Sequence, residues 1–243
     1  MRLDSPPTGY YNHRMNRALL AVMLLASPAL AVDPPADHGP LQGTVSALTG
    51  DVTIQSKGAG TLAKKGSTFT SGDTVVTASK ATAVLSLPDG SKLKLRGDSR
   101  LKVTLPGPKS AVTEAYLTAG GVFARVAKRL AGHEFKVRTP TAVAAVRGTE
   151  FFTAFGRARG KKTDLWVCVN EGAVAVETDK SKDPLVVPAG KGILIKSGLD
   201  TTKPQAYDWT KSLNWNMADE AGEIEDKTDL GAAYSDLLDQ DYR

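Results

Sequence analysis

The side chains that could carry out chemistry are few in this chain of 243 residues, and they lie far apart in the sequence. The chain has one cysteine, Cys168, and three histidines, His13, His38 and His133, without the spacing of a zinc or iron-sulfur site. The short motifs of nucleophilic hydrolases, zinc proteases and dinucleotide-binding enzymes are absent. The sequence therefore predicts no catalytic residue, no cofactor site and no metal site, and it favours a protein that is not an enzyme.

The stretch GRARGKKT, residues 156–163, comes nearest to a phosphate-binding loop, but it is one residue short between its glycines. Strand-like sequence follows it, so we expect no helix N-terminus whose backbone amides could bind phosphate. We interpret the stretch as a solvated hairpin tip, with anion binding as the weaker alternative. Its cations are Arg157, Arg159, Lys161 and Lys162.

The stretch LPDGSKLKLRGDSRLKV, residues 87–103, alternates apolar and basic residues after an Asp-Gly turn signal. Alternation with a period of two places the apolar side chains on one face of a sheet and the basic side chains on the other. The basic face is a candidate binding surface for a polyanion such as an anionic glycan or a lipid headgroup. Its members are Lys92, Lys94, Arg96, Arg100 and Lys102, and the tip at residues 157–162 could add to them.

Short alternating runs of this kind, separated by glycine, proline and Asp-Gly signals, continue through residues 41–199. They predict one all-β domain, an antiparallel sandwich or roll, and they leave a short solenoid-like stack open as an alternative. Cys168 lies inside the predicted strand DLWVCV, where we expect a buried and poorly reactive thiol.

The N-terminal residues 1–31 predict an export signal. The stretch MNRALLAVMLLASPALA, residues 15–31, has a basic start, a short apolar run and the cleavage pattern Ala29-Leu30-Ala31, and it suggests Met15 as the true start. The apolar run is shorter than the roughly 20 residues that cross a bilayer, which disfavours a retained anchor. We therefore expect a periplasmic or secreted mature protein that begins near Val32, without a transmembrane span, and with a proline-rich linker over residues 32–40.

Charge divides the expected mature chain into a basic body and an acidic tail. Residues 32–199 contain 24 basic and 14 acidic residues, whereas residues 200–243 contain 4 basic and 11 acidic residues. We favour a tail that folds back on the cationic face of its own domain, because tethering gives opposite charges a high effective concentration. The alternative is a tail that presents apolar anchors to a partner. The stretch GAAYSDLLDQ, residues 231–240, could form an amphipathic helix in this tail. The candidate anchors are Trp209, Leu213, Trp215, Leu230, Tyr234, Leu237 and Leu238.

The order of these stretches resembles the FecR family of bacterial envelope proteins. The resemblance begins with LQGTVSALTGDVTI, residues 41–54, and it is strongest in FKVRTPTAVAAVRGTEF, residues 135–151. We interpret this signature as mostly structural, with a turn or sheet edge at Thr139-Pro140 and small residues that pack closely. For Arg147 a structural role is favoured over a ligand contact. The signature residues are Thr139, Pro140, Ala142, Val146, Arg147, Gly148 and Thr149.

The resemblance implies a regulatory role, since FecR-like regulators combine a cytoplasmic anti-sigma segment, a membrane helix and a periplasmic domain. We expect only the periplasmic part in this chain, and we do not extend iron-transport regulation to it. The main hypothesis is a protein-interaction or signalling module of the envelope whose partner is another envelope protein. The alternative is an envelope protein that binds anionic glycan or lipid. A nucleic acid partner is disfavoured, because an exported protein rarely meets one and no aromatic-basic stacking motif is present.

Overall fold

In the computed structural model the described residues are 41–107, 110–128, 134–159, 162–181, 183–196, 200–219 and 223–230. They all belong to the second of two units, residues 38–243. The predicted export signal, the linker and the helix expected beyond Leu230 lie outside the described residues. No helix among the described residues is long and apolar enough to cross a membrane.

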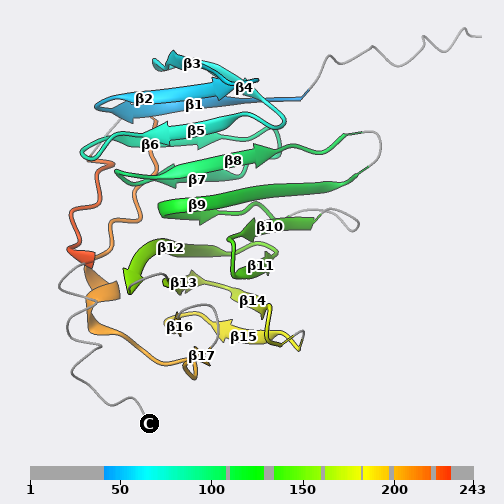
Figure 1. The fold of residues 1–243 in the computed structure, drawn as a ribbon, viewed down its shortest axis with the longest axis vertical. Helices are drawn as coiled ribbons and strands as arrows, with labels where there is room; N and C mark the ends of the chain where they lie inside the picture. The colour runs from blue at the N-terminus through cyan, green and yellow to red at the C-terminus, as the bar shows by residue number, and fades with distance from the viewer. Residues whose placement is uncertain are drawn as a thin grey trace, which may run out of the picture. The chain divides into compact units, whose positions relative to one another are not determined.

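More than half of the described residues lie in strands and very few lie in a helix, so the prediction of an all-β fold is confirmed (Figure 1). The strands are β1 (Gln42–Thr49), β2 (Val52–Ser56), β3 (Ala59–Leu62), β4 (Thr68–Thr70), β5 (Thr74–Thr77), β6 (Thr82–Ser86), β7 (Lys92–Leu95), β8 (Arg100–Thr104), β9 (Val112–Arg125), β10 (Glu134–Arg138), β11 (Ala142–Val146), β12 (Glu150–Arg159), β13 (Lys162–Glu171), β14 (Ala173–Thr178), β15 (Leu185–Pro188), β16 (Gly192–Lys196) and β17 (Asp200–Thr201).

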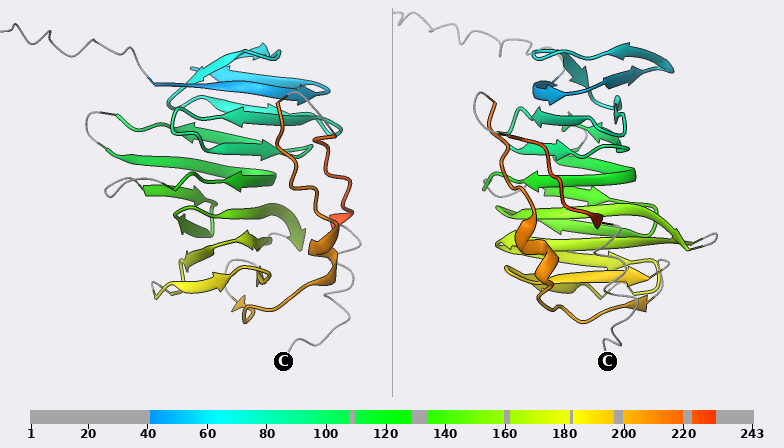
Figure 2. Two further views of the ribbon diagram at one scale, coloured as in Figure 1. Left: turned by 180° about the vertical axis from the view of Figure 1, so that it is seen from behind. Right: turned by 90° about the vertical axis from the view of Figure 1, so that its left-hand side faces the viewer.

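The strands form two ladders that share the long strand β9. Sheet A has the order β4-β1-β6-β7-β9-β12-β13-β16-β17. Sheet B has the order β3-β2-β5-β8-β9-β10-β11-β14-β15. The pairs are antiparallel except for the parallel pair β9–β10. Both ladders advance in the direction of the chain, so that successive strands stack from β1 to β17 (Figures 1 and 2).

Strand β9 passes from sheet B to sheet A at Gly120, where the backbone φ is +80°. A Cβ atom at this position would lie 2.3 Å from Ser99 Oγ and 2.5 Å from Ser99 Cα. Because glycine alone accepts both this φ and this close approach without strain, it allows one strand to join the two sheets.

The main apolar core lies between the sheets and takes side chains from both. Leu93 and Leu95 of β7 point into it, as the alternation predicted, and Leu101 and Val103 of β8 reach it from the other sheet. A second apolar cluster contains the alternate side chains of sheet A, and it therefore lies on the outer face of that sheet. Its sheet members are Val84, Phe123, Phe152, Ala154, Trp166 and Leu194.

Beyond β17 the described chain is mostly extended and contains one short 3-10 helix, η1 (Asp208–Ser212). This segment crosses the strands of sheet A and covers the second apolar cluster (Figure 2, right panel). Sheet A is thus covered on both faces, by sheet B on one side and by the tail on the other. Residues 207–219 and 223–230 are called the strap from here on.

Candidate binding surface

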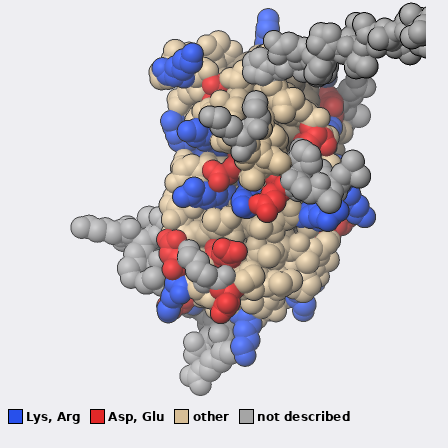
Figure 3. Space-filling model, turned by 90° about the vertical axis from the view of Figure 1, so that its right-hand side faces the viewer, with Lys and Arg blue, Asp and Glu red and all other residues tan. Residues whose placement is uncertain are grey.

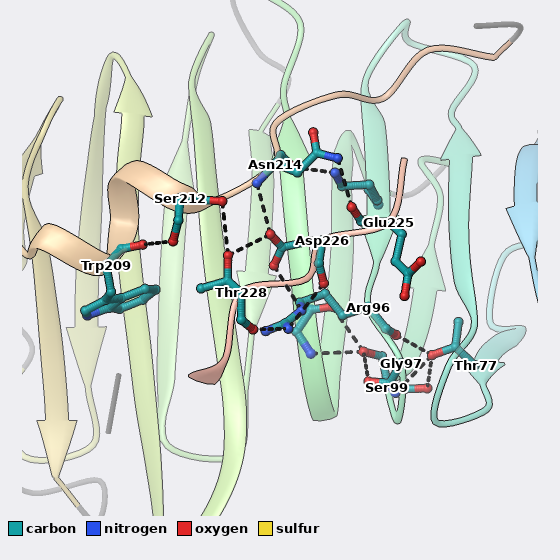
Figure 4. Close-up of polar contacts among 12 residues, drawn as sticks. Thr77, Arg96, Gly97, Ser99, Trp209, Ser212, Asn214, Glu225, Asp226 and Thr228 are labelled. Carbon is teal, nitrogen blue, oxygen red and sulfur yellow. Dashed lines mark hydrogen bonds and ion pairs between the residues drawn. The ribbon is translucent and has the colours of Figure 1, made fainter. Parts of the chain in front are cut away.

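The strap consists of two extended stretches that side chains join together. Asn214 Nδ2 donates to the carbonyl oxygens of Glu223, at 2.8 Å, and Glu225, at 2.9 Å. The backbone N–H of Asn214 donates to Asp226 Oδ1 at 2.9 Å, and the same oxygen accepts from Thr228 Oγ1 at 2.9 Å (Figure 4). The hydrogen bonds of Asn214 therefore hold the returning stretch beside the first one.

Aromatic side chains anchor the strap on the outer face of sheet A. The Trp166 ring makes edge contacts with Tyr207, at a centroid distance of 5.1 Å, and with Trp209, at 5.4 Å. Further along the strap, Trp215 makes an edge contact with Phe123 at 5.2 Å. Such pairs contribute roughly 0.5–1.5 kcal/mol each beyond the burial of their surface. The other anchors on the strap are Leu213, Met217 and Ile224, which are buried, and Leu230, which is partly buried.

Lys94 lies fully buried beneath the strap, although the sequence suggested an exposed cation. Its Nζ donates to the carbonyl oxygen of Asn214 and, at 2.9 Å, to that of Asn216. The ammonium group also lies 4.4 Å from the centroid of the Phe123 ring. Burial lowers the pKa of Lys94 from its ordinary 10.5 to about 8, and the carboxylates of Asp226 and Glu150 oppose this shift.

Arg96, the residue after β7, is a second cation that the strap covers, and it faces the returning stretch. Its Nε lies 3.1 Å from Asp226 Oδ2, and its Nη2 donates to the carbonyl oxygen of Thr228 at 2.7 Å (Figure 4). The Asp226 side chain is only 1% exposed and that of Arg96 only 17%, so the ion pair is largely removed from water. A buried pair of this kind loses much more when one partner is removed than an exposed pair does.

Two further cations bind the strap near its edges. Lys92 Nζ donates to Asp219 Oδ1 at 2.9 Å, and this ion pair lowers the pKa of Asp219. Arg125 Nη2 donates to the carbonyl oxygen of Trp215 at 3.3 Å, while the same guanidinium group pairs with Glu150 at 2.6 Å. The favoured prediction, that the acidic tail docks on its own domain, agrees with these contacts for the described part of the tail.

The predicted basic face is not a single surface, and this expectation was wrong. Lys92, Lys94 and Arg96 lie on the outer face of sheet A, whereas Arg100 and Lys102 belong to β8 in sheet B. The alternation correctly predicts the two sides of each strand, but the chain changes sheet between β7 and β8, at a tight turn that period-two alternation does not reveal. Arg100 is also engaged locally, since its Nη2 donates to Gln55 Oε1 at 2.7 Å.

The side of the molecule opposite to the strap shows no large area of one charge (Figure 3). Basic and acidic groups are intermixed there, among other residues. The hairpin predicted at residues 156–163 is present, because β12 and β13 pair as far as Arg159 and Lys162. Its cationic side chains lie outside the described residues, so the anion-binding alternative for this tip stays a prediction.

The signature stretch at residues 139–149 turns between strands and contributes to the core. Thr139 N–H donates to the carbonyl oxygen of Ala142 at 2.9 Å, and Thr139 Oγ1 accepts from Ala142 N–H at 3.1 Å. Pro140 is exposed at this turn, and Ala142 joins the main core. Thr139 and Ala142 therefore have structural roles, as the sequence indicated.

The end of the signature comprises Val146, the last residue of β11, and the residues that follow it. Val146 is partly buried against the main core, Arg147 is exposed, and Gly148 has a φ of +60°, an angle that glycine adopts without strain. Thr149 is buried, and its carbonyl oxygen accepts from Val126 N–H at 2.8 Å. The structural role favoured for Arg147 stays a prediction, and so does the alternative of a ligand contact.

Sequence reasoning missed the partners of the strap on sheet A, above all Phe123, Trp166 and Arg125. A signal for them was present, because VFA and LWVCV are continuous apolar runs and only Thr153 interrupts FFTAF, and such runs are typical of strands buried on both faces. Cys168 is buried, as expected, and burial raises the pKa of its thiol. Among the described residues, no group of three or more His, Cys, Asp or Glu side chains could hold a metal ion.

Replacing Asp226 with asparagine should loosen the strap. The change removes the buried carboxylate that faces Arg96, and we expect the free energy of unfolding to fall by about 3 kcal/mol. Urea denaturation followed by tryptophan fluorescence measures this loss. Asp208→Asn is the matched control, because Asp208 pairs with Lys211 at an exposed site and its replacement should have no measurable effect. Equal effects of the two changes would contradict the buried ion pair.

The buried Lys94 should make stability rise with pH in a defined window. Between about pH 8 and pH 10.5 the unfolded chain binds more protons at this residue than the folded chain does. The free energy of unfolding should therefore gain up to about 3 kcal/mol from Lys94 as the pH rises through this window. Comparing urea denaturation of the wild type and Lys94→Met across the window isolates this contribution, because other titrating groups are common to both. Parallel pH profiles would show that the pKa of Lys94 is not lowered.

Comparisons with known proteins complete these observations. Residues 73–187 match the family model described as FecR protein. Two crystal structures of a candidate anti-sigma factor from Parabacteroides distasonis ATCC 8503, at 1.65 Å and 2.50 Å resolution, are similar to this chain. Their sequence identities are 18% and 19%, and their TM-scores are 0.48 and 0.47.

The alignments with these structures cover 57% of this chain and 63% and 62% of the other chains, so this chain spans less than two thirds of their length. The comparison with curated proteins gave no match. The family match includes the signature stretch at residues 139–149 and runs from β5 into β15. On this match residues 73–187 of the chain contain a FecR domain.

Proposed function

We propose that this FecR-domain protein is a non-enzymatic interaction or signalling module of the bacterial envelope. The observation that carries the proposal is the outer face of sheet A, which holds an extended segment of its own chain through buried aromatic contacts and cation-to-carbonyl hydrogen bonds. A surface of this composition suits protein recognition, since aromatic residues and arginine are enriched at protein interfaces.

Export is the second part of the proposal, and it is supported by sequence. The stretch at residues 15–31 has the basic start, apolar run and small-residue cleavage pattern of a secretory signal. An exported chain would meet envelope proteins as partners, in agreement with the resemblance that the sequence shows.

The alternative function, binding of anionic glycan or lipid, has less support from the arrangement of charges. Lys92, Lys94 and Arg96 donate to the strap, and Arg100 and Lys102 lie on the other sheet. A polyanion would therefore have to displace the strap before it could reach Lys94 and Arg96, two of the five predicted cations.

Site-specific photocrosslinking in cells tests the proposed function. The full chain is expressed with a photoreactive amino acid in place of Lys211, which is exposed on the strap, and, as a matched control, in place of Lys102, which is exposed on sheet B. We expect a periplasmic or secreted product with its N-terminus near Val32, and a discrete protein adduct from position 211 only.

Two results would contradict the proposal. A product that keeps residues 1–31 and stays in the cytoplasm would refute export. The absence of any protein adduct from position 211, together with co-purification of anionic glycan or lipid, would favour the alternative function.

A further inference from the structure

We propose that the outer face of sheet A is a binding site for extended segments of other polypeptides, and that the strap is the ligand that occupies it in cis. The partner is an extended acidic segment with aromatic and aliphatic anchors at alternate positions, like the strap itself. This inference rests on the proposed function, and it specifies the site and the class of partner.

The cations on this face bind the main chain of the strap more than its side chains. Lys94, Arg96 and Arg125 donate to carbonyl oxygens, and so does Lys92, which reaches that of Met217 at 3.4 Å. Most backbone carbonyl groups of a helix are already used within the helix, so a helical segment could not satisfy these donors. The site therefore selects an extended ligand and tolerates variation in the side chains between the anchors. The accepting carbonyls belong to Asn214, Trp215, Asn216, Met217, Asp226 and Thr228.

The anchors follow the two-residue period of an extended chain. Leu213, Trp215 and Met217 face the sheet, and Asn214 and Asn216 alternate with them. Burial of one leucine or methionine side chain contributes about 1.5–3 kcal/mol relative to its exposure. The spacing of these anchors, together with Phe123 and Trp166 on the sheet, should determine which segments bind.

The strap is held in a way that permits exchange. In the described part of the chain, residues 207–219 and 223–230 form no backbone-to-backbone hydrogen bond with a strand. The last such contacts are at Thr202 and Gln205, which pair with Leu194 and Gly192 before the strap begins. A competing segment would replace side-chain contacts and carbonyl acceptors, and it would leave both ladders intact.

Charge supports an acidic ligand. Asp219 faces Lys92, and Asp226 faces Arg96, so two carboxylates of the strap match two cations of β7 and the residue after it. A basic segment would place like charges together on a partly buried surface, which is unfavourable.

The test uses the full chain with its strap released by Leu213→Asp and Met217→Asp, changes that leave every sheet residue in place. The probe is a fluorescently labelled peptide of residues 207–230 with the wild-type sequence, and its fluorescence anisotropy is followed during titration. We expect saturable binding with one peptide per chain. The wild type should bind at least about tenfold more weakly, because its tethered strap competes at a high effective concentration.

Controls separate specific binding from adhesion and from unfolding. A scrambled peptide should not bind, and adding Phe123→Ala to the released variant should weaken binding of the wild-type peptide about tenfold or more. Should the double variant fail to fold, Asn214→Ala replaces it, since this change removes the side-chain hydrogen bonds to Glu223 and Glu225 and leaves every sheet residue in place. Circular dichroism and the slow thiol reaction expected of the buried Cys168 verify folding of the variant that is used.

A folded released variant that does not bind the peptide, or that binds the scrambled peptide equally well, would overturn the inference. The two proposals fail separately. A protein adduct in cells together with no peptide binding would place recognition elsewhere and leave the proposed function standing. Peptide binding without export or a protein adduct would support the site and contradict the proposed function.

Discussion

The need to cover the second face of sheet A is the constraint on which the rest of the structure depends. Sheet B already buries the inner face, and the outer face still carries Val84, Phe123, Phe152 and Trp166. Exposed apolar surface of this extent is unfavourable in water, and it marks binding sites when it does occur. The strap covers this face with aromatic and aliphatic side chains of its own, so that the described part of the acidic tail becomes part of the folded domain.

The positions of Lys94, Arg96 and Arg125 follow from the same constraint. The strap crosses the strands without pairing with them, so its carbonyl groups receive no hydrogen bond from a neighbouring strand. Burial of a carbonyl group without a hydrogen bond is costly in free energy. Lys94 and Arg96 supply donors at these positions, and Arg125 adds a third near the edge. The basic body and the acidic tail of the sequence are thus two sides of one intramolecular interface. An interface that recognises main chain and anchors is also suited to bind other extended segments.

Much of the fold could be predicted from the sequence, because two-residue alternation and turn residues are local signals. These signals correctly predicted that Leu93 and Leu95 point into the core and that the chain turns at Thr139. They could not show that β8 lies in the other sheet, since alternation describes one strand at a time. The binding surface was harder to predict, because the hydrogen bonds from Lys94 to Asn216 and from Arg96 to Thr228 join residues 122 and 132 positions apart and follow no period.

Zero-length crosslinking tests the central claim, that the strap docks on sheet A of its own chain. Lys92 Nζ and Asp219 Oδ1 lie 2.9 Å apart and both side chains are partly exposed, so a carbodiimide should convert this ion pair into an amide bond. In a mixture of isotopically light and heavy protein, the account predicts crosslinked peptides containing Lys92 and Asp219 that are entirely light or entirely heavy. The absence of this crosslink, or its presence only between light and heavy chains, would contradict docking within one chain.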